Sequence, residues 1–169
     1  MHTPVPTSRR CWHGDCAVTP PPWYSIHMAA HLDTTVLIIE DDPILGELVE
    51  LIVKKSYTTT LTPTMALAEQ FLGDNEPPNI ILIDIILPDG NGFDLLRKIR
   101  TNERYANSLC VMFTNLSQAS DKSRAFELGA DEYYVKANID LSKLPELLYE
   151  LLQKKCSGQP TRDEGGEGV

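Results

Sequence analysis

The 169-residue chain lacks long apolar runs and an excess of basic residues, and each absence excludes a class of protein. Its longest apolar run, residues 80–87, is interrupted by Asp84 and is much shorter than the ~20 residues that cross a bilayer. There are 24 Asp and Glu but only 15 Lys and Arg, and the resulting net charge of −9 repels phosphate backbones. We therefore expect neither membrane insertion nor direct nucleic-acid binding.

Cysteine is also scarce, and nothing resembles a secretory signal. Of the 4 cysteines, Cys110 and Cys156 have no partner nearby in the sequence, so they do not form the framework of a disulfide-rich protein. Residues 11–15, which follow two arginines near the N-terminus, lack the continuous apolar stretch of a signal peptide. These features predict a cytoplasmic protein.

The composition changes near both ends of the chain. Residues 1–32 contain five prolines and no sustained hydrophobic period, which predicts a disordered leader. Residues 156–169 are rich in glycine and acidic residues and are too short for an output domain, so we predict a disordered acidic tail. Residues 33–155 remain, and their length fits one domain.

Within this domain, short apolar runs alternate with longer amphipathic patterns. The runs are rich in β-branched or aromatic residues, as buried strands are, and cover residues 36–39, 57–61, 79–83, 109–113 and 132–135. The amphipathic patterns predict helices over residues 44–52, 65–72, 93–99, 119–128 and 141–152. Asp42, followed by Pro43, and Asp140 stand where helix caps are expected. Five consecutive strand–helix units predict an α/β fold with a parallel sheet covered on both faces.

Polar side chains stand at the ends of four predicted strands. Glu40 and Asp41 follow the first, Asp84 follows the third, Thr114 follows the fourth, and Lys136 follows the fifth. In an open parallel sheet the binding crevice lies beyond these carboxyl ends. Carboxylates held close together repel one another unless a cation neutralises them, and Mg²⁺ suits a set of oxygen ligands. The sequence therefore predicts a magnesium site at this rim.

Four segments resemble the signature blocks of two-component response-regulator receiver domains. They are VLIIEDDP (36–43), LIDIILPDGNG (82–92), MFTN (112–115) and GADEYYVK (129–136), and they occur in the order of the family. The resemblance extends over essentially all of residues 33–155. It implies a flavodoxin-like, doubly wound sheet of five parallel strands in the order 2-1-3-4-5, with five helices.

The resemblance also implies a role for each of these strand-end residues. Asp84 would be the phosphoacceptor, whose carboxylate attacks the phosphorus of a phosphohistidine donor. Asp41 would bind Mg²⁺ directly and Glu40 through water, with Asp84 and the backbone carbonyl of Ile86 completing the protein ligands. Asp42 is expected to be a helix cap rather than a ligand.

Three further residues would respond to phosphorylation. Lys136 would pair with phosphoryl oxygens, and Thr114 would hydrogen-bond to one of them. Thr114 and Tyr133 match the switch pair of the family, although Tyr133 is equally well explained as a core residue. The family usually has proline after the lysine that matches Lys136, but this chain has Ala137. We expect the Lys136–Ala137 peptide bond to be trans, because a cis bond before a non-proline residue costs ~3 kcal/mol.

The resemblance implies a single-domain response regulator rather than an enzyme, one that catalyses only its own phosphorylation and dephosphorylation. Its partners would be a histidine kinase or histidine phosphotransfer protein and a downstream protein. One alternative is a degenerate receiver that binds partners without phosphorylation. A phosphatase of the haloacid-dehalogenase type is disfavoured because Ile86 stands where that family needs a second aspartate. A dinucleotide or flavin binder would need a Gly-rich turn where residues 41–43 stand.

Overall fold

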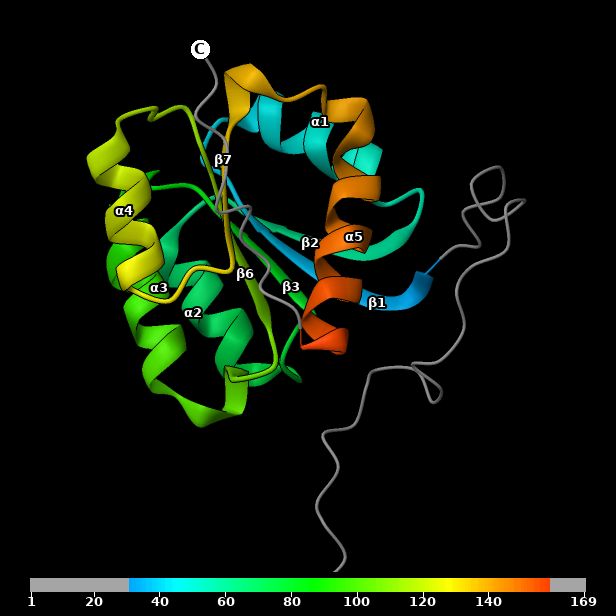
Figure 1. Ribbon diagram of the computed structural model, residues 1–169, viewed down its shortest axis with the longest axis horizontal. Helices are drawn as coiled ribbons and strands as arrows, with labels where there is room; N and C mark the ends of the chain where they lie inside the picture. Colours follow the sequence, from blue (N-terminus) through cyan, green and yellow to red (C-terminus); the bar gives the residue numbers. More distant parts are fainter. Residues whose placement is uncertain (1–30, 159–169) are drawn as a thin grey trace, which may run out of the picture.

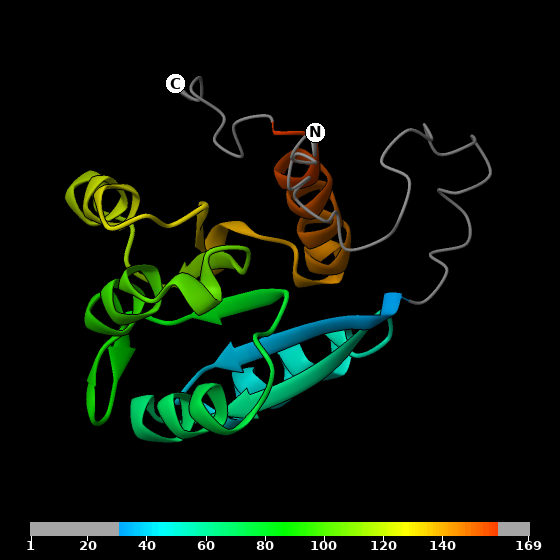
Figure 2. The same cartoon turned by 90° about the horizontal axis from the view of Figure 1, so that it is seen from below.

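Five parallel strands form the central sheet of the computed structural model, which describes residues 31–158 (Figure 1). The strand order is β2-β1-β3-β6-β7, and every neighbouring pair is parallel. Figure 2 shows β1 between β2 and β3. The strands are β1 (His31–Ile39), β2 (Tyr57–Thr62), β3 (Ile80–Ile83), β6 (Leu109–Thr114) and β7 (Glu132–Val135). Numbered within the sheet, this is the predicted order 2-1-3-4-5, so the flavodoxin-like fold is confirmed.

Five helices cover the two faces of this sheet (Figure 1). Alternate residues of a strand point to opposite faces, and in β1 the side chains of Leu37 and Ile39 pack with α2, α3 and α4, while those of Val36 and Ile38 pack with α1 and α5. Both faces of the sheet are therefore buried, as the apolar runs predict. The helices are α1 (Pro43–Val53), α2 (Met65–Asp74), α3 (Gly92–Thr101), α4 (Ala119–Glu127) and α5 (Leu144–Ser157).

The first helix begins as the sequence predicts. The Asp42 carboxylate accepts hydrogen bonds from the backbone N–H groups of Ile44 and Leu45 at 2.9 and 3.0 Å. Asp42 therefore provides acceptors for donors that a helix N-terminus leaves without intrahelical partners. Its assignment as a helix cap is confirmed.

The last helix begins later than predicted. Asp140 caps the short 3-10 helix η4 (Leu141–Lys143) through the Ser142 N–H at 3.0 Å, and α5 itself starts at Leu144 without a side-chain cap. Pro145 stands in the first turn of α5, where its missing N–H is harmless and its fixed φ angle favours a helix start. The apolar period runs through both elements, so periodicity alone does not separate them.

The loop after β3 contains a small hairpin that the sequence pattern does not predict. β4 (Ile86–Leu87) pairs antiparallel with β5 (Gly90–Asn91), and Gly92 then opens α3. A Cβ atom on Gly92 would lie 2.0 Å from the backbone oxygen of Asp84, so only glycine fits here. The hairpin thus folds back tightly against the residue predicted to accept the phosphoryl group.

The 3-10 helices η2 (Glu103–Tyr105) and η3 (Lys136–Asn138) follow α3 and β7. The predicted leader and tail lie outside the described residues, except that β1 includes residues 31 and 32 and α5 continues to Ser157. Among residues 31–158, no helix is long and apolar enough to cross a membrane.

Candidate phosphoryl and metal site

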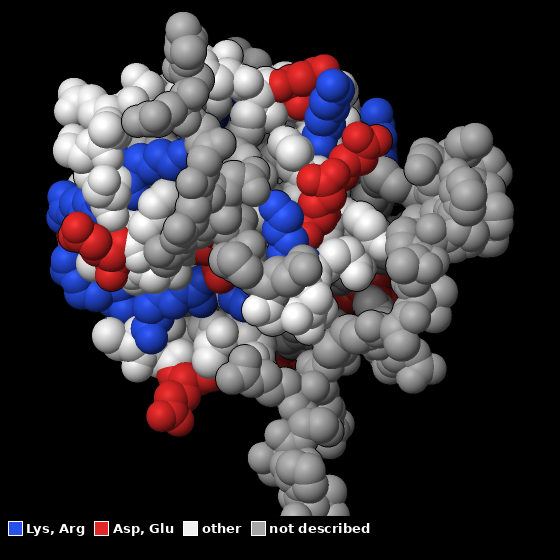
Figure 3. Space-filling model, viewed as in Figure 1, with Lys and Arg blue, Asp and Glu red and all other residues white. Residues whose placement is uncertain are grey.

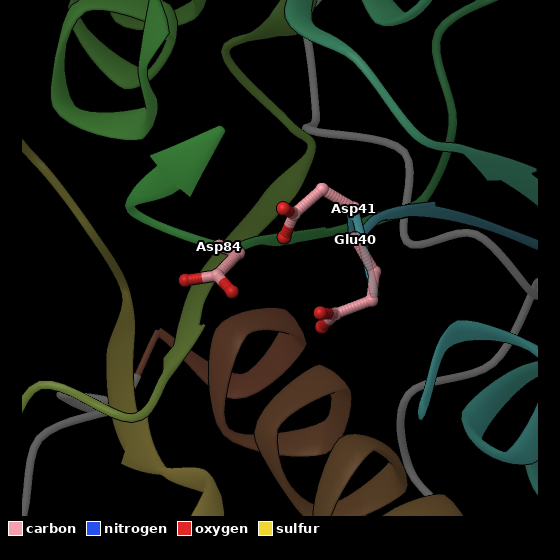
Figure 4. A group of neighbouring side chains, drawn as sticks. All are labelled: Glu40, Asp41 and Asp84. Carbon is pink, nitrogen blue, oxygen red and sulfur yellow. The ribbon is translucent and has the colours of Figure 1, made fainter. Parts of the chain in front are cut away.

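Three carboxylates meet at the carboxyl-terminal rim of the sheet. Glu40 and Asp41 follow β1, and Asp84 follows β3, which pairs with β1 in parallel. Because parallel neighbours end at the same edge, these side chains are brought together, and one oxygen of each lies within 4.8 Å of the others. Figure 4 shows the three carboxylates directed toward a common space. Asp41 is exposed, whereas Glu40 and Asp84 are buried.

Lys136 joins this cluster from the end of β7. Its Nζ lies 2.5 Å from Glu40 Oε2 and 2.5 Å from Asp84 Oδ2, and the residue is 7% exposed. The ammonium also lies 5.6 Å from the centre of the Phe113 ring. A buried lysine is costly unless it is paired, and here two carboxylates pair with it. The sequence predicts Lys136 at this rim but does not predict its contact with Glu40.

The electrostatics of Glu40 show how crowded this rim is. Burial raises the pKa of Glu40 above its ordinary value and outweighs the opposing effect of the Lys136 ammonium. The nearby Asp84 carboxylate raises the pKa further. Lys136 therefore does not compensate fully for the burial of Glu40, and an additional cation would favour the charged form of Glu40.

The donor set fits Mg²⁺. Glu40, Asp41 and Asp84 offer only hard oxygen ligands, and the exposed Asp41 lies on the side open to solvent, where water or phosphoryl oxygens could complete an octahedral shell. Next to them, the Ile86 N–H donates to Asp84 Oδ1 at 3.3 Å. The role of the Ile86 carbonyl as a ligand stays a prediction.

Thr114 and Tyr133 are both buried and both contact the backbone of Leu116. The Leu116 N–H donates to Thr114 Oγ1 at 3.4 Å, and the Tyr133 hydroxyl donates to the Leu116 carbonyl at 2.9 Å. Tyr133 belongs to the core on the face covered by α2, α3 and α4. Burial, with the Asp121 and Asp84 carboxylates, raises the pKa of Tyr133 to about 12, so its hydroxyl remains a donor. The link through Leu116 uses backbone atoms, which leave no signature in the sequence.

Ala137 follows Lys136 inside η3. The described residues contain no cis peptide bond, so the Lys136–Ala137 bond is trans, as expected for a non-proline residue. The trans bond still leaves the Lys136 ammonium within contact of Asp84.

Comparison with protein families gives a match over most of the described residues. The model of the response regulator receiver domain matches residues 36–149. Among curated relatives, the DNA-binding dual master transcriptional regulator RpaA of Synechocystis sp. is 33% identical over 101 residues, covering 60% of this chain and 42% of the relative. The transcriptional regulatory protein BaeR of Escherichia coli is 36% identical over 104 residues, covering 60% and 41%. The chain thus matches only about two-fifths of the length of these relatives.

Solved structures share the fold. A CheY-like response regulator receiver domain protein from Methanospirillum hungatei superposes with a TM-score of 0.66 at 25% identity, covering 74% of this chain and 98% of that one. The response regulator DrrB of Thermotoga maritima gives a TM-score of 0.64 at 22% identity, covering 78% and 57%. The second likeness supports the fold alone.

Proposed function

Because this chain belongs to the response regulator receiver domain family, we propose that it accepts a phosphoryl group on Asp84 and passes the signal on through protein contacts. The observation that carries the proposal is the convergence of Lys136 on Asp84 and Glu40, from strand ends far apart in the sequence. A buried carboxylate beside a fixed ammonium and an exposed acidic ligand is suited to phosphoryl transfer, which depends mainly on positioning and charge stabilisation.

The two oxygens of Asp84 have different partners, which orients the carboxylate. Oδ2 contacts the Lys136 ammonium, and Oδ1 accepts the Ile86 N–H. We propose that one carboxylate oxygen attacks the phosphorus of a phosphohistidine donor, so that an O–P bond forms as the P–N bond breaks and the imidazole leaves with the electron pair. Asp41, Asp84 and the Ile86 carbonyl would hold Mg²⁺ directly and Glu40 would hold it through water, and the ion would neutralise phosphoryl charge when bound.

Lys136 would exchange one anionic partner for another during this reaction. Before transfer its ammonium lies between the Glu40 and Asp84 carboxylates. Afterwards the phosphoryl group adds negative charge at Asp84, and Lys136 would pair with its oxygens. The lysine therefore stabilises both the free and the phosphorylated protein without leaving the rim.

The response would pass through Thr114, Leu116 and Tyr133. If the Thr114 hydroxyl turns toward the phosphoryl oxygens, its contact with the Leu116 N–H is lost. The Leu116 carbonyl is the acceptor for the Tyr133 hydroxyl, so a shift of this loop would release the ring and change the surface formed by α4, β7 and α5.

We further propose that the chain acts as a response-regulator receiver in the cytoplasm, and that it turns over no substrate other than its own phosphoryl group. Its partners would be a histidine kinase or a histidine phosphotransfer protein, and a downstream protein that reads the phosphorylated surface. The net charge of −9 supports protein contacts rather than direct contact with nucleic acid.

Labelling with a small acyl-phosphate donor tests the proposal. The full chain is incubated with the donor and Mg²⁺, and peptide mass mapping is expected to find one added phosphoryl group on Asp84. Omitting Mg²⁺ or introducing Asp84→Asn is expected to abolish the label, while Asp94→Asn, at an exposed aspartate on α3, keeps it. An unlabelled Asp84 in a folded, Mg²⁺-saturated chain would overturn the proposal and favour a binding module that works without phosphorylation.

A further inference from the structure

We infer that Asp89 is a positioning residue for the magnesium site, because its carboxylate fixes the β4–β5 hairpin to the N-terminus of α2 and thereby holds the Ile86 carbonyl in place. This inference rests on the proposed function, in which that carbonyl is a ligand. Asp89 itself does not belong to the carboxylate cluster of Glu40, Asp41 and Asp84.

Both oxygens of Asp89 are engaged by α2. Oδ1 accepts the Met65 N–H at 2.8 Å, and Oδ2 accepts the Ala66 N–H at 2.8 Å. These are the first two N–H groups of the helix, and the third, that of Leu67, donates to Thr64 Oγ1 at 3.2 Å. The N-terminal donors of α2 are thus divided between its own cap and the tip of a hairpin more than 20 residues away. Two hydrogen bonds accepted by one carboxylate fix the direction of the hairpin tip as well as its distance from α2.

Close contacts hold the hairpin at its tip and at its base. At the tip, a Cβ atom on Gly90 would lie 2.5 Å from the Met65 Cε atom, so the hairpin backbone packs directly on α2. At the base, the Gly92 N–H donates to the Ile85 carbonyl at 2.9 Å, and Gly92 lies against the Asp84 backbone. Ile86 lies between these two attachments.

The side chain of Ile86 contributes little to holding that residue. It is 59% exposed, so its orientation is set mainly by the backbone on either side. The N–H groups of Ala66 and Met65 hold the pKa of Asp89 below its ordinary value, because they hydrogen-bond to the charged carboxylate. The carboxylate is therefore in its charged, accepting form at neutral pH, as an aspartate ordinarily is.

The affinity for Mg²⁺ depends strongly on the position of a carbonyl ligand. Mg²⁺ requires nearly ideal octahedral geometry at short distances, so a ligand displaced by a few tenths of an ångström binds poorly. Groups that orient metal ligands commonly change metal affinity by about 10-fold or more when removed. We expect Asp89→Ala to weaken Mg²⁺ binding about 10-fold, although Asp89 does not touch the ion.

Thr64→Ala supplies a matched control. It removes a cap from the same helix end but leaves the hairpin contacts intact. In the full chain, Mg²⁺ affinity is measured by isothermal titration and the midpoint of thermal unfolding without Mg²⁺ is recorded. Asp89→Ala and Thr64→Ala are both expected to lower the midpoint, and only Asp89→Ala is expected to weaken Mg²⁺ binding. Asp89→Asn keeps one acceptor oxygen and should bind Mg²⁺ with an affinity between those of wild type and Asp89→Ala. This variant replaces Asp89→Ala in the test if the alanine variant does not fold.

The outcomes separate this inference from the proposed function. Equal Mg²⁺ affinity in wild type, Asp89→Ala and Asp89→Asn would show that Asp89 only stabilises the fold, and would overturn the inference alone. Wild type that binds no Mg²⁺ would overturn both the magnesium site and the inference. Binding of Mg²⁺ that depends on Asp89, in a chain that the acyl phosphate does not label, would support the inference while the proposed function fails.

Discussion

At the scale of single residues, Lys136 is the cation that pairs with the buried carboxylates of the site. Its ammonium lies in the protein interior between Glu40 and Asp84, and both ion-pair distances are 2.5 Å. A buried ion pair contributes little net stability compared with an apolar replacement of both partners, but removal of one partner leaves an uncompensated buried charge. The site therefore depends on this lysine even before any phosphoryl group arrives.

Replacement of Lys136 by methionine is expected to reduce the free energy of unfolding by about 3 kcal/mol in the presence of a chelator, because Glu40 and Asp84 then lose their only described cationic partner. Urea denaturation measures the change. Mg²⁺ should recover part of the loss by neutralising the same carboxylates. Lys54→Met, at an exposed position after α1, is the control and should change stability little. Equal stability of the two variants would contradict the assignment of a buried ion pair.

Two buried weak acids, Cys110 and Tyr133, are expected to make the folded protein less stable at high pH. Burial raises the pKa of the Cys110 thiol from 9.0 to about 12, and that of the Tyr133 hydroxyl from 10.0 to about 12. The native fold favours both protonated forms, so their contribution is fully present below about pH 9 and is lost as the pH rises toward 12. Urea denaturation across this window should show that the Cys110→Ala, Tyr133→Phe double variant loses stability less steeply than wild type. Parallel pH profiles would contradict the prediction.

At the scale of elements, adjacent aspartates at the start of α1 have separate tasks. Asp42 is bonded to the helix N-terminus, whereas the Asp41 carboxylate lies with Glu40 and Asp84. Asp41 and Asp42 have the same side chain but different contacts, because the backbone turns between them from the strand end into the helix.

This division predicts opposite effects for two alanine variants. Asp42→Ala is expected to cost about 1 kcal/mol of stability, as the loss of a helix cap does, with only a small change in Mg²⁺ affinity. Asp41→Ala is expected to abolish Mg²⁺ binding without the loss of a cap. Thermal unfolding and isothermal titration on both variants measure the two quantities. Loss of Mg²⁺ binding in Asp42→Ala at unchanged stability would reverse the assignment.

The sequence predicts most of the fold at this scale for a physical reason. Each helix buries one face, which imposes a period of 3.6 on its apolar residues, and strands buried on both faces read as continuous apolar runs. The hairpin of β4 and β5 is not predicted because its strands have two residues each, too few to show a period. The start of α5 is displaced for a related reason, since Leu141 and Leu144 both fit the apolar period but belong to different helix types.

The sequence predicts which residues form the site but not which of their side chains contact one another. Strand ends bring Glu40, Asp41, Asp84 and Lys136 to one rim by topology alone. The pairing of Lys136 with Glu40 depends on side-chain orientation across several strands, and the anchoring of Asp89 depends on a contact with a distant helix. Neither the pairing nor the anchoring leaves a local pattern in the sequence.

At the scale of the whole molecule, charge is unevenly distributed. Figure 3 shows Lys and Arg side chains gathered on the side where α3 and α4 lie, although the chain is acidic overall. Some of these cations are held by packing, as Arg124 of α4 lies 4.5 Å from the centre of the Phe93 ring of α3.

A second ionic cluster ties several elements together at the opposite end of the sheet. Asp131, just before β7, pairs with Arg100 of α3 at 2.5 Å and with Lys155 of α5 at 3.1 Å. The same carboxylate accepts the Cys110 N–H of β6 at 2.7 Å. Its side chain is only 17% exposed, so solvent screens these contacts weakly. No local sequence pattern predicts this cluster, because its members come from four separate parts of the chain.

Asp131→Asn is expected to cost about 2 kcal/mol of stability, since it removes the charge that two cations share in a partly buried setting. Asp94→Asn removes the partner of Arg97 in a pair that is 53% exposed on both sides, and should cost little. Urea denaturation compares the two variants. If both lose the same amount, the Asp131 cluster has no special role in joining the elements.

A crystal structure of the full chain with Mg²⁺ and beryllofluoride, a mimic of the phosphoryl group, would show whether Asp84 is the phosphoacceptor of a magnesium site. We expect Mg²⁺ bound by Asp41, Asp84 and the Ile86 carbonyl, with Glu40 reached through water. We also expect beryllofluoride on Asp84, in contact with Lys136 and Thr114. Beryllofluoride absent from Asp84, or Mg²⁺ bound elsewhere while Lys136 keeps both carboxylates, would contradict that role of Asp84.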